Sequence, residues 1–184
     1  IKSAFDFAKL NHKGQIRGTG EDYFTHPLAV AEILIGMKLD ASTIMTALLH
    51  DVVEDSKVTL KDITNQFGSE IAKLVDGVTK LSKIELKFGL AQAENFRKLM
   101  VSSSDDIRVL LVKLADRLHN VRTIEGIKTK HKQQKICKET LEIYVPLAER
   151  LGITAIKSEL EDKCFSIINP DTRNSISKRL ELIY

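Results

Sequence analysis

Several residue types that often stabilise or mark a protein are scarce in this chain. Tryptophan is absent, and aromatic residues make up only 5% of the 184 residues, so a hydrophobic core has to be built mainly from aliphatic side chains. The two cysteines, Cys137 and Cys164, lie far apart in the sequence and do not form a metal-spaced pair. A chain of this size needs no disulfide, which favours a reducing compartment and predicts a cytoplasmic protein.

Long apolar runs and a strong net charge are also missing. No stretch approaches the ~20 apolar residues of a transmembrane helix, and no charged-then-apolar leader is present, so we expect no membrane association. The net charge of +3 is too small to indicate nucleic-acid binding. It remains compatible with a local basic patch that meets a small anionic ligand.

What the sequence does contain is helical periodicity along nearly its whole length. Apolar residues recur three and four positions apart, and no segment shows the alternation of a β-strand. Hydrophobic residues make up 43% of the chain and charged residues 29%, which suits one domain with a sizeable core. We therefore predict an all-α fold of about ten helices over residues 1–184.

Helix boundaries can be predicted at several positions. Pro27 suits the first turn of a helix, and Asp40 suits the N-cap of the next one. Thr59, with an acid three residues later, resembles a capping box. Helices are predicted at about 93–103 and 131–151, and Pro170 should start the last helix. Residues 82–92 are rich in lysine, contain a glycine and lack a clean period, which predicts a mobile loop.

The stretch "TALLHDVVEDS", residues 46–56, crowds charges at the end of an apolar helix. The helix that begins after Asp40 is predicted to run through His50 into these acids, so His50, Asp51, Glu54 and Asp55 share one face, because positions three and four apart are neighbours. Three carboxylates so close together repel one another, and a bound divalent cation would relieve this repulsion. The alternative is a solvated helix end with a chance histidine.

Two further segments place polar residues where a core is expected. His26 lies in "YFTHPLAV" at a helix entrance, and Asp116 interrupts the apolar "VLLVKLADRLHNV". Asn120 and Thr123 extend the face that carries Asp116. The alternatives are that His26 is a capping or satisfied buried histidine, and that Asp116 pairs with a neighbouring cation such as Lys113.

Together these positions suggest a metal site. Two imidazoles and two carboxylates suit Mn, Fe or Zn, whereas Ca and Mg sites are more often made of oxygen alone. The candidate ligands are His26, His50, Asp51 and Asp116. Glu54 and Asp55 would lie beside the metal, where one carboxylate could deprotonate a water and the other could hold or relay the proton.

These residues stand in blocks that resemble the HD-superfamily hydrolase domain of the RelA/SpoT homologues, the (p)ppGpp enzymes. The resemblance covers almost all 184 residues, and the blocks occur in the family order. They include "HKGQIR" (12–17), "THPLAVAEIL" (25–34), "ALLHDVVEDS" (47–56), "DIRVLLVKLADRLHNVRT" (106–123) and "ETLEIYVPLAERLGI" (139–153).

The resemblance implies a fold, a cofactor and a reaction. It implies an all-α domain with a single metal ion, usually Mn²⁺, held by the four candidate ligands. It assigns Glu54 and Asp55 to the catalytic pair that positions the attacking water. The implied reaction removes the 3′-pyrophosphate of guanosine tetra- or pentaphosphate, the alarmones of the stringent response, and gives GDP or GTP and pyrophosphate.

The resemblance also implies residues that bind the nucleotide. Arg17 matches the arginine that packs on the guanine, and Thr19, Asn120 and Thr123 match positions near the nucleotide. One departure from the family pattern lies in "RGTG", residues 17–20, where Gly18 replaces a lysine. The loss of this charge is expected to weaken binding of a polyphosphate, unless other lysines compensate.

Members of this family differ on the C-terminal side of the hydrolase domain. Long ones carry a synthetase domain, and short ones consist of the hydrolase alone; residues 168–184 resemble the region that leads toward the synthetase. Two other functions remain open: an HD phosphohydrolase for another nucleotide such as NADPH, and a non-catalytic domain that binds a nucleotide. Cyclic-dinucleotide enzymes of the HD-GYP type are disfavoured, because the chain contains no Gly-Tyr-Pro.

Overall fold

The computed structural model describes residues 1–87 and 106–181, and this part of the chain is almost entirely helical. Its α-helices are α1 (Lys2–Asn11), α2 (Thr25–Gly36), α3 (Ala41–Leu49), α4 (Val52–Asp55), α5 (Leu60–Phe67), α6 (Ser69–Lys87), α8 (Ile107–Arg122), α9 (Lys130–Glu139), α10 (Val145–Arg150), α11 (Thr154–Ile168) and α12 (Pro170–Glu181). A 3₁₀ turn, η2 (Ile124–Gly126), follows α8, and a π-helix, η3 (Thr140–Tyr144), follows α9. The predicted all-α fold is confirmed.

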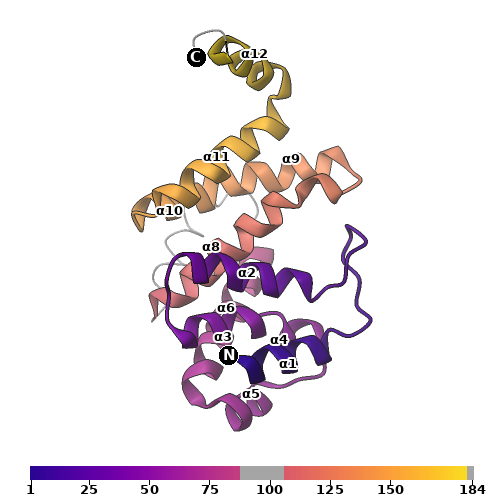
Figure 1. Ribbon diagram of the computed structural model, residues 1–184, viewed down its shortest axis with the longest axis vertical. Helices are drawn as coiled ribbons and strands as arrows, with labels where there is room; N and C mark the ends of the chain where they lie inside the picture. Colours follow the sequence, from indigo (N-terminus) through magenta and orange to yellow (C-terminus); the bar gives the residue numbers. More distant parts are fainter. Residues whose placement is uncertain (88–105, 182–184) are drawn as a thin grey trace.

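Helix α8 connects the two halves of the molecule (Figure 1). Helices α1 to α6 form one half, in which α2 packs on α3 and on α8. In the other half, α11 packs on α8, α9 and α10. Because α8 contacts both halves, ten of its residues are buried, and a polar side chain on it can lie between the two halves.

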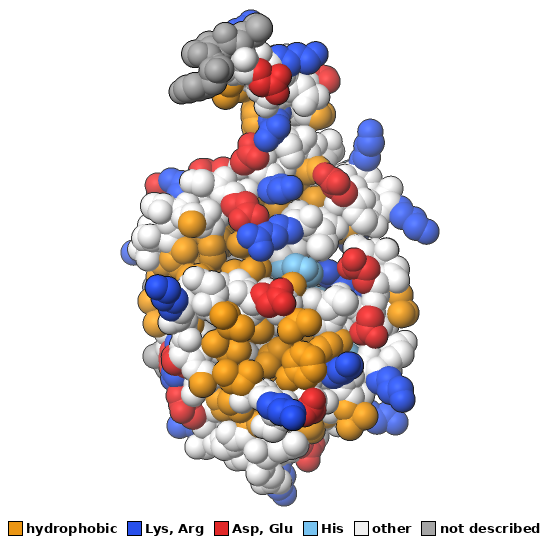
Figure 2. Space-filling model, viewed as in Figure 1, with side chains coloured by type: hydrophobic (Ala, Val, Ile, Leu, Met, Phe, Trp, Pro, Cys, Tyr) orange, Lys and Arg blue, Asp and Glu red, His pale blue; other side chains and the backbone are white. Residues whose placement is uncertain are grey.

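The core is mainly aliphatic, as the composition predicts. Apart from Tyr144, the largest fully buried side chains are leucines and one isoleucine. On the face shown in Figure 2, hydrophobic side chains gather over the region of α2 and α3, and charged side chains of both signs are mixed over the half that carries α9, α11 and α12. No helix in the described ranges is both long enough and apolar enough to cross a membrane.

Most of the predicted helix boundaries are confirmed. The Asp40 carboxylate caps α3 by accepting a hydrogen bond of 2.8 Å from the backbone N–H of Thr43. Thr59 and Asp62 form the predicted capping box of α5, which ends at Gly68 with a φ of 89°, a conformation that glycine adopts without strain. Pro170 begins α12. Local hydrogen-bonding chemistry is therefore sufficient to define these ends.

The prediction of one helix running through the His50 segment is wrong. Helix α3 ends at Leu49, a turn follows, and α4 begins at Val52. The His50 ring donates a hydrogen bond of 2.7 Å to the carbonyl of Ala47, which is the acceptor that the N–H of Asp51 would use in a continuous helix. His50 and Asp51 therefore lie in a short turn between two helices, although the backbone angles of both residues stay in the right-handed helical region.

Two other boundaries differ from the prediction. Residues 82–87 of the predicted loop 82–92 are part of helix α6. The physical reason is that lysine is a good helix former and that buried Val78 and Leu81 anchor this helix. The remaining five residues of the predicted loop, and the helix predicted at about 93–103, lie outside the described residues. The helix predicted at about 131–151 is interrupted by the π-helix η3.

Helix α12 differs from the other helices in having no buried residue. It contacts α11 and projects away from the rest of the molecule (Figure 1). The prediction that residues 168–184 lead toward a further domain stays a prediction.

Candidate metal centre

Three of the four predicted metal ligands lie together at the start of α2 and in the turn between α3 and α4. One ligand atom each from His26, His50 and Asp51 lies within 4.8 Å of the others. The Nε2 atom of His50 is 3.1 Å from Asp51 Oδ1, and the Nε2 atom of His26 is 3.6 Å from Asp51 Oδ2. Both histidines are buried. The cluster is therefore a candidate divalent-metal site enclosed by protein.

The hydrogen bonding of His50 indicates which of its two ring nitrogens can bind a metal ion. A carbonyl can only accept, so Nδ1 of His50 must carry the proton that bonds to Ala47. In the neutral ring the lone pair then lies on Nε2, and this buried atom has no hydrogen-bond partner among the described residues. A buried polar atom without a partner destabilises a fold, whereas an imidazole lone pair beside a carboxylate suits a divalent cation.

His26 is oriented by a second histidine that was not predicted from the sequence. Its Nδ1 atom lies 2.7 Å from Nδ1 of His119. Burial is the main cause that lowers the pKa of His119 to about 4, and the charge of Arg17 acts in the same direction, so His119 is neutral near pH 7 and can accept the proton of His26. This leaves the Nε2 lone pair of His26 directed toward the cluster. His119 lies three positions after Asp116 on α8, a spacing that would have placed it on the same helix face.

The fourth predicted ligand, Asp116, lies beside His26 and has other partners as well. Its Oδ1 atom is 3.1 Å from Nε2 of His26 and accepts a hydrogen bond of 2.7 Å from Asn120. Its Oδ2 atom is 3.0 Å from Nζ of Lys113, so the ion pair that the sequence left open is present. Burial opposes ionisation of Asp116, but its charged neighbours, of which Lys113 has the largest effect, outweigh burial and hold its pKa well below the usual value. Asp116 is thus an anion adjacent to the cluster.

The predicted catalytic acids lie next to this cluster in different environments. Partial burial and the charge of Asp51 raise the pKa of Glu54, which is the direction that makes a carboxylate a better base near neutral pH. Asp55 instead contacts Tyr23, whose hydroxyl lies 2.7 Å from Asp55 Oδ2 and 3.0 Å from Asp51 Oδ2. Burial and the charge of Asp51 raise the pKa of Tyr23, so it remains a phenol that can donate. Tyr23 was not among the predicted site residues, because Tyr23 and Asp51 are 28 positions apart and no local pattern indicates their contact.

A hollow of about 350 Å³ opens beside Asp116. The four predicted nucleotide-binding residues, Arg17, Thr19, Asn120 and Thr123, all line it. Cations outnumber acids among its lining side chains, with Arg17, Lys113, Arg117 and Lys132 against Asp116 alone. This excess of positive charge next to a candidate metal site favours an anionic ligand such as a polyphosphate.

Arg17 connects this hollow to the metal centre through hydrogen bonds. Its Nη2 atom donates to Asn120 Oδ1 at 2.9 Å, and its Nη1 atom lies 3.5 Å from Thr123 Oγ1. Because Asn120 also donates to Asp116, the arginine, the amide and the candidate ligand form one chain. The turn at residues 17–20 is therefore held against the end of α8.

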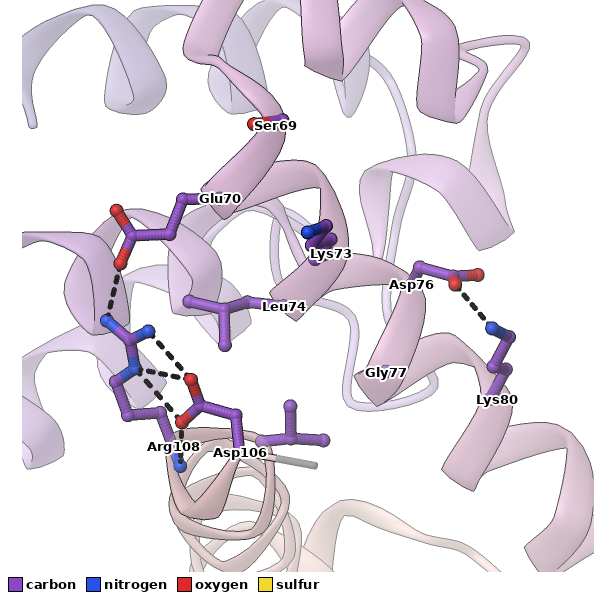
Figure 3. A pocket seen from close by; sticks show the side chains of 10 residues that line it. Ser69, Glu70, Lys73, Leu74, Asp76, Gly77, Lys80, Asp106 and Arg108 are labelled. Carbon is purple, nitrogen blue, oxygen red and sulfur yellow. Dashed lines mark hydrogen bonds and ion pairs between the residues drawn. The ribbon is translucent and has the colours of Figure 1, made fainter. Parts of the chain in front are cut away.

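A larger hollow of about 580 Å³ lies between α6 and the start of α8. Its charged side chains balance in number, with Lys73, Lys80 and Arg108 against Glu70, Asp76 and Asp106. Figure 3 shows that several of them are already paired: Arg108 bonds to Glu70 at 2.7 Å and to Asp106, and Lys80 bonds to Asp76 at 2.6 Å. Because the positive and negative side chains of this hollow balance, it offers little net attraction for a polyphosphate. The larger volume therefore does not make it the better candidate for the nucleotide site.

Comparison with known proteins places this geometry in a family. The family model described as "HD domain" matches residues 4–154. A solved structure titled "A metazoan ortholog of SpoT hydrolyzes ppGpp and plays a role in starvation responses" shares the fold with a TM-score of 0.66, at 24% sequence identity, over 92% of this chain and 93% of that one.

Curated relatives are similar along nearly the entire chain. A "GTP pyrophosphokinase" of Myxococcus xanthus is 50% identical over 98% of this chain, and the "Bifunctional (p)ppGpp synthase/hydrolase SpoT" of Escherichia coli is 51% identical over 93% of it. The chain spans 24% of the length of each of these relatives. With an all-α fold, a His-Asp cluster and a family model that matches most of its residues, the chain belongs to the HD domain family and is similar to the RelA/SpoT-type members of it.

Proposed function

We propose that this domain is a Mn²⁺-dependent hydrolase that removes the 3′-pyrophosphate of guanosine tetra- or pentaphosphate and releases GDP or GTP and pyrophosphate. The observation that carries the proposal is the buried His50 Nε2 atom, which has no hydrogen-bond partner among the described residues and lies beside His26 and Asp51, next to a hollow with an excess of cations. The name of the Escherichia coli O157:H7 relative, "Guanosine-3′,5′-bis(diphosphate) 3′-pyrophosphohydrolase", supports the choice of substrate; that protein is 51% identical to this chain over 172 residues.

In this proposal His26, His50, Asp51 and Asp116 hold the metal. A divalent cation supplies Lewis acidity to a phosphoryl oxygen and to water. The His26–His119 and His50–Ala47 hydrogen bonds keep the Nε2 lone pairs of both histidines directed at one point. The ion pair with Lys113 keeps Asp116 ionised. The protein thus prepares the site before any ligand enters.

The chemistry requires movement of one proton. Hydrolysis breaks the bond between the ribose 3′ oxygen and the adjacent phosphorus; water provides a hydroxyl to the phosphorus and a proton to the 3′ oxygen. Glu54 accepts this proton from the attacking water, since its raised pKa makes it the better base, and the proton then passes to the departing 3′ oxygen. Asp55, held by Tyr23, orients the attacking water. The nucleotide lies in the hollow beside Asp116, with its base on Arg17 and with Thr19, Asn120 and Thr123 along its walls.

The direct test is to incubate the purified chain with Mn²⁺ and ppGpp and to follow the release of pyrophosphate. We expect turnover that stops when the metal is chelated. A chain that binds Mn²⁺ but leaves ppGpp intact while hydrolysing NADPH would establish the other phosphohydrolase activity. A chain that binds both metal and nucleotide and releases nothing would indicate a regulatory domain.

Restoring a lysine at position 18 should tighten substrate binding. Gly18 lines the hollow, its backbone is not in the left-handed region, and an added Cβ would meet nothing within 4 Å. In Gly18→Lys a partly exposed charge is expected to contribute about 1 kcal/mol, which lowers the KM for ppGpp about fivefold and leaves kcat unchanged. Steady-state kinetics measure this. The matched control is Gly36→Lys, which adds the same charge at an equally open glycine outside this hollow and should leave KM unchanged.

Adding a methyl group at Gly126 should displace the turn at residues 17–20. A Cβ there would lie 2.4 Å from Thr19 Cγ2 and 3.0 Å from Thr19 Cβ, so the turn that carries Arg17 has to move. Gly126→Ala is expected to raise the KM for ppGpp about fivefold, which corresponds to about 1 kcal/mol of overpacking. Adding Thr19→Ser removes the closest methyl group and keeps the hydroxyl, so it should recover part of the loss. An unchanged KM in the single variant would show that this contact does not position Arg17.

A further inference from the structure

We propose that Tyr23 is a positioning residue, whose hydroxyl fixes the candidate catalytic acid Asp55 relative to the candidate metal ligand Asp51. This inference rests on the proposed function, since it concerns the same site. The hydroxyl lies between the two carboxylates, 2.7 Å from Oδ2 of Asp55 and 3.0 Å from Oδ2 of Asp51. Of the two Asp51 oxygens, Oδ1 is the one close to His50, so Tyr23 holds the carboxylate by the opposite oxygen.

The Tyr23 ring is itself held in a fixed place. It stacks on the buried ring of His12, with 4.9 Å between centroids and 25° between planes. Its backbone N–H donates to the carbonyl of Gln15 at 2.9 Å. The side chain of Gln15 accepts from Nδ1 of His12 at 2.7 Å and donates to the backbone carbonyl of Asp55 at 2.7 Å. His12 and Gln15 therefore hold both the Tyr23 ring and the backbone of Asp55 in place. These contacts fix the position of the Tyr23 hydroxyl beside the two carboxylates.

The charge arrangement explains why a hydroxyl is needed at this point. Two carboxylates that face each other repel when both are ionised. A phenol has one hydrogen, which it can donate to either carboxylate, so it can lie between them without adding charge. No other side chain in the described part of the chain donates a hydrogen bond to the Asp55 carboxylate. Removing the hydroxyl should leave the Asp55 side chain free to rotate away from Asp51, so that it no longer orients the attacking water.

The test is Tyr23→Phe, which keeps the ring and its stacking on His12 and removes the oxygen alone. Partners of this kind around a metal site typically change affinity or activity 10–100-fold. We expect kcat for ppGpp to fall about tenfold with KM within twofold, and the Mn²⁺ dissociation constant from calorimetric titration to rise about tenfold. The thermal unfolding temperature of the metal-free chain should stay close to that of the wild type, because the ring packing is retained.

A double-mutant cycle shows whether the hydroxyl acts through Asp55. Tyr23→Phe combined with Asp55→Asn should be no slower than Asp55→Asn alone, because both changes interrupt the same contact. Additive losses, or a kcat and Mn²⁺ affinity both within twofold of wild type in Tyr23→Phe, would overturn the inference. A wild-type chain that does not hydrolyse ppGpp would contradict the proposed function instead. The Mn²⁺ titration of Tyr23→Phe, which needs no substrate, would then decide the role of Tyr23 at Asp51.

Discussion

Replacing His50 with alanine is expected to abolish both metal binding and hydrolysis. His50 presents a buried Nε2 lone pair beside Asp51, and alanine removes this atom from the centre of the candidate site. Loss of a partner that only orients a ligand already costs roughly 10–100-fold in metal affinity or activity, so loss of a ligand itself should cost more. Calorimetric titration with Mn²⁺ and pyrophosphate release from ppGpp measure the two effects separately.

The matched control for His50→Ala is His131→Ala, which makes the same chemical change at an exposed position of α9. It should leave metal affinity and turnover at their wild-type values. Far-UV circular dichroism of His50→Ala is needed as well, because the His50 ring also bonds to Ala47 at the end of α3. A folded His50→Ala variant that binds Mn²⁺ as tightly as the wild type would remove His50 from the metal site.

Glu54→Gln is expected to separate metal binding from catalysis. Glutamine has nearly the same shape as glutamate but cannot accept a proton from water, so the variant should bind Mn²⁺ normally and lose turnover. General-base catalysis typically contributes about 10²- to 10⁴-fold, and we expect kcat for ppGpp to fall within that range. Because the substrate contacts in the hollow are unaffected, KM should change little.

The corresponding control is Glu181→Gln in α12, where the side chain is exposed and no helix residue is buried. It should show wild-type kinetics. Unchanged turnover in Glu54→Gln would exclude Glu54 from the mechanism and leave Asp55 as the candidate base. Loss of Mn²⁺ binding in the same variant would instead indicate that Glu54 is a ligand, for which the His26–His50–Asp51 geometry gives no support.

The helical fold and many helix ends depend on local chemistry, and the sequence was sufficient to predict them. The capping bonds of Asp40 and Thr59 join residues three positions apart, so spacing alone identifies them. The same holds for the relation between Asp116 and Asn120, which lie four positions apart on α8 and are joined by a hydrogen bond of 2.7 Å. His119, three positions after Asp116, could have been included by the same reasoning.

The break after Leu49 was missed because the hydrogen bond found beside it, from the His50 ring to the Ala47 carbonyl, is not visible in the sequence. Helix propensity and the apolar spacing of residues 41–55 favour a continuous helix. The His50 side chain takes the carbonyl of Ala47, and this bond becomes visible only when the direction of the ring is known. His50 and Asp51 lie in this turn, and the packing of α2 on α3 brings them beside His26.

By itself the sequence determined the all-α class and indicated most of the candidate site residues, because periodicity, capping and residue chemistry act over a few positions. The tertiary structure decided which of these side chains meet. Tyr23 contacts Asp51 and Asp55, His119 contacts His26, and these pairs are separated by 28, 32 and 93 positions. Contacts over such distances depend on how α2, the α3–α4 turn and α8 pack, and no local pattern encodes that packing.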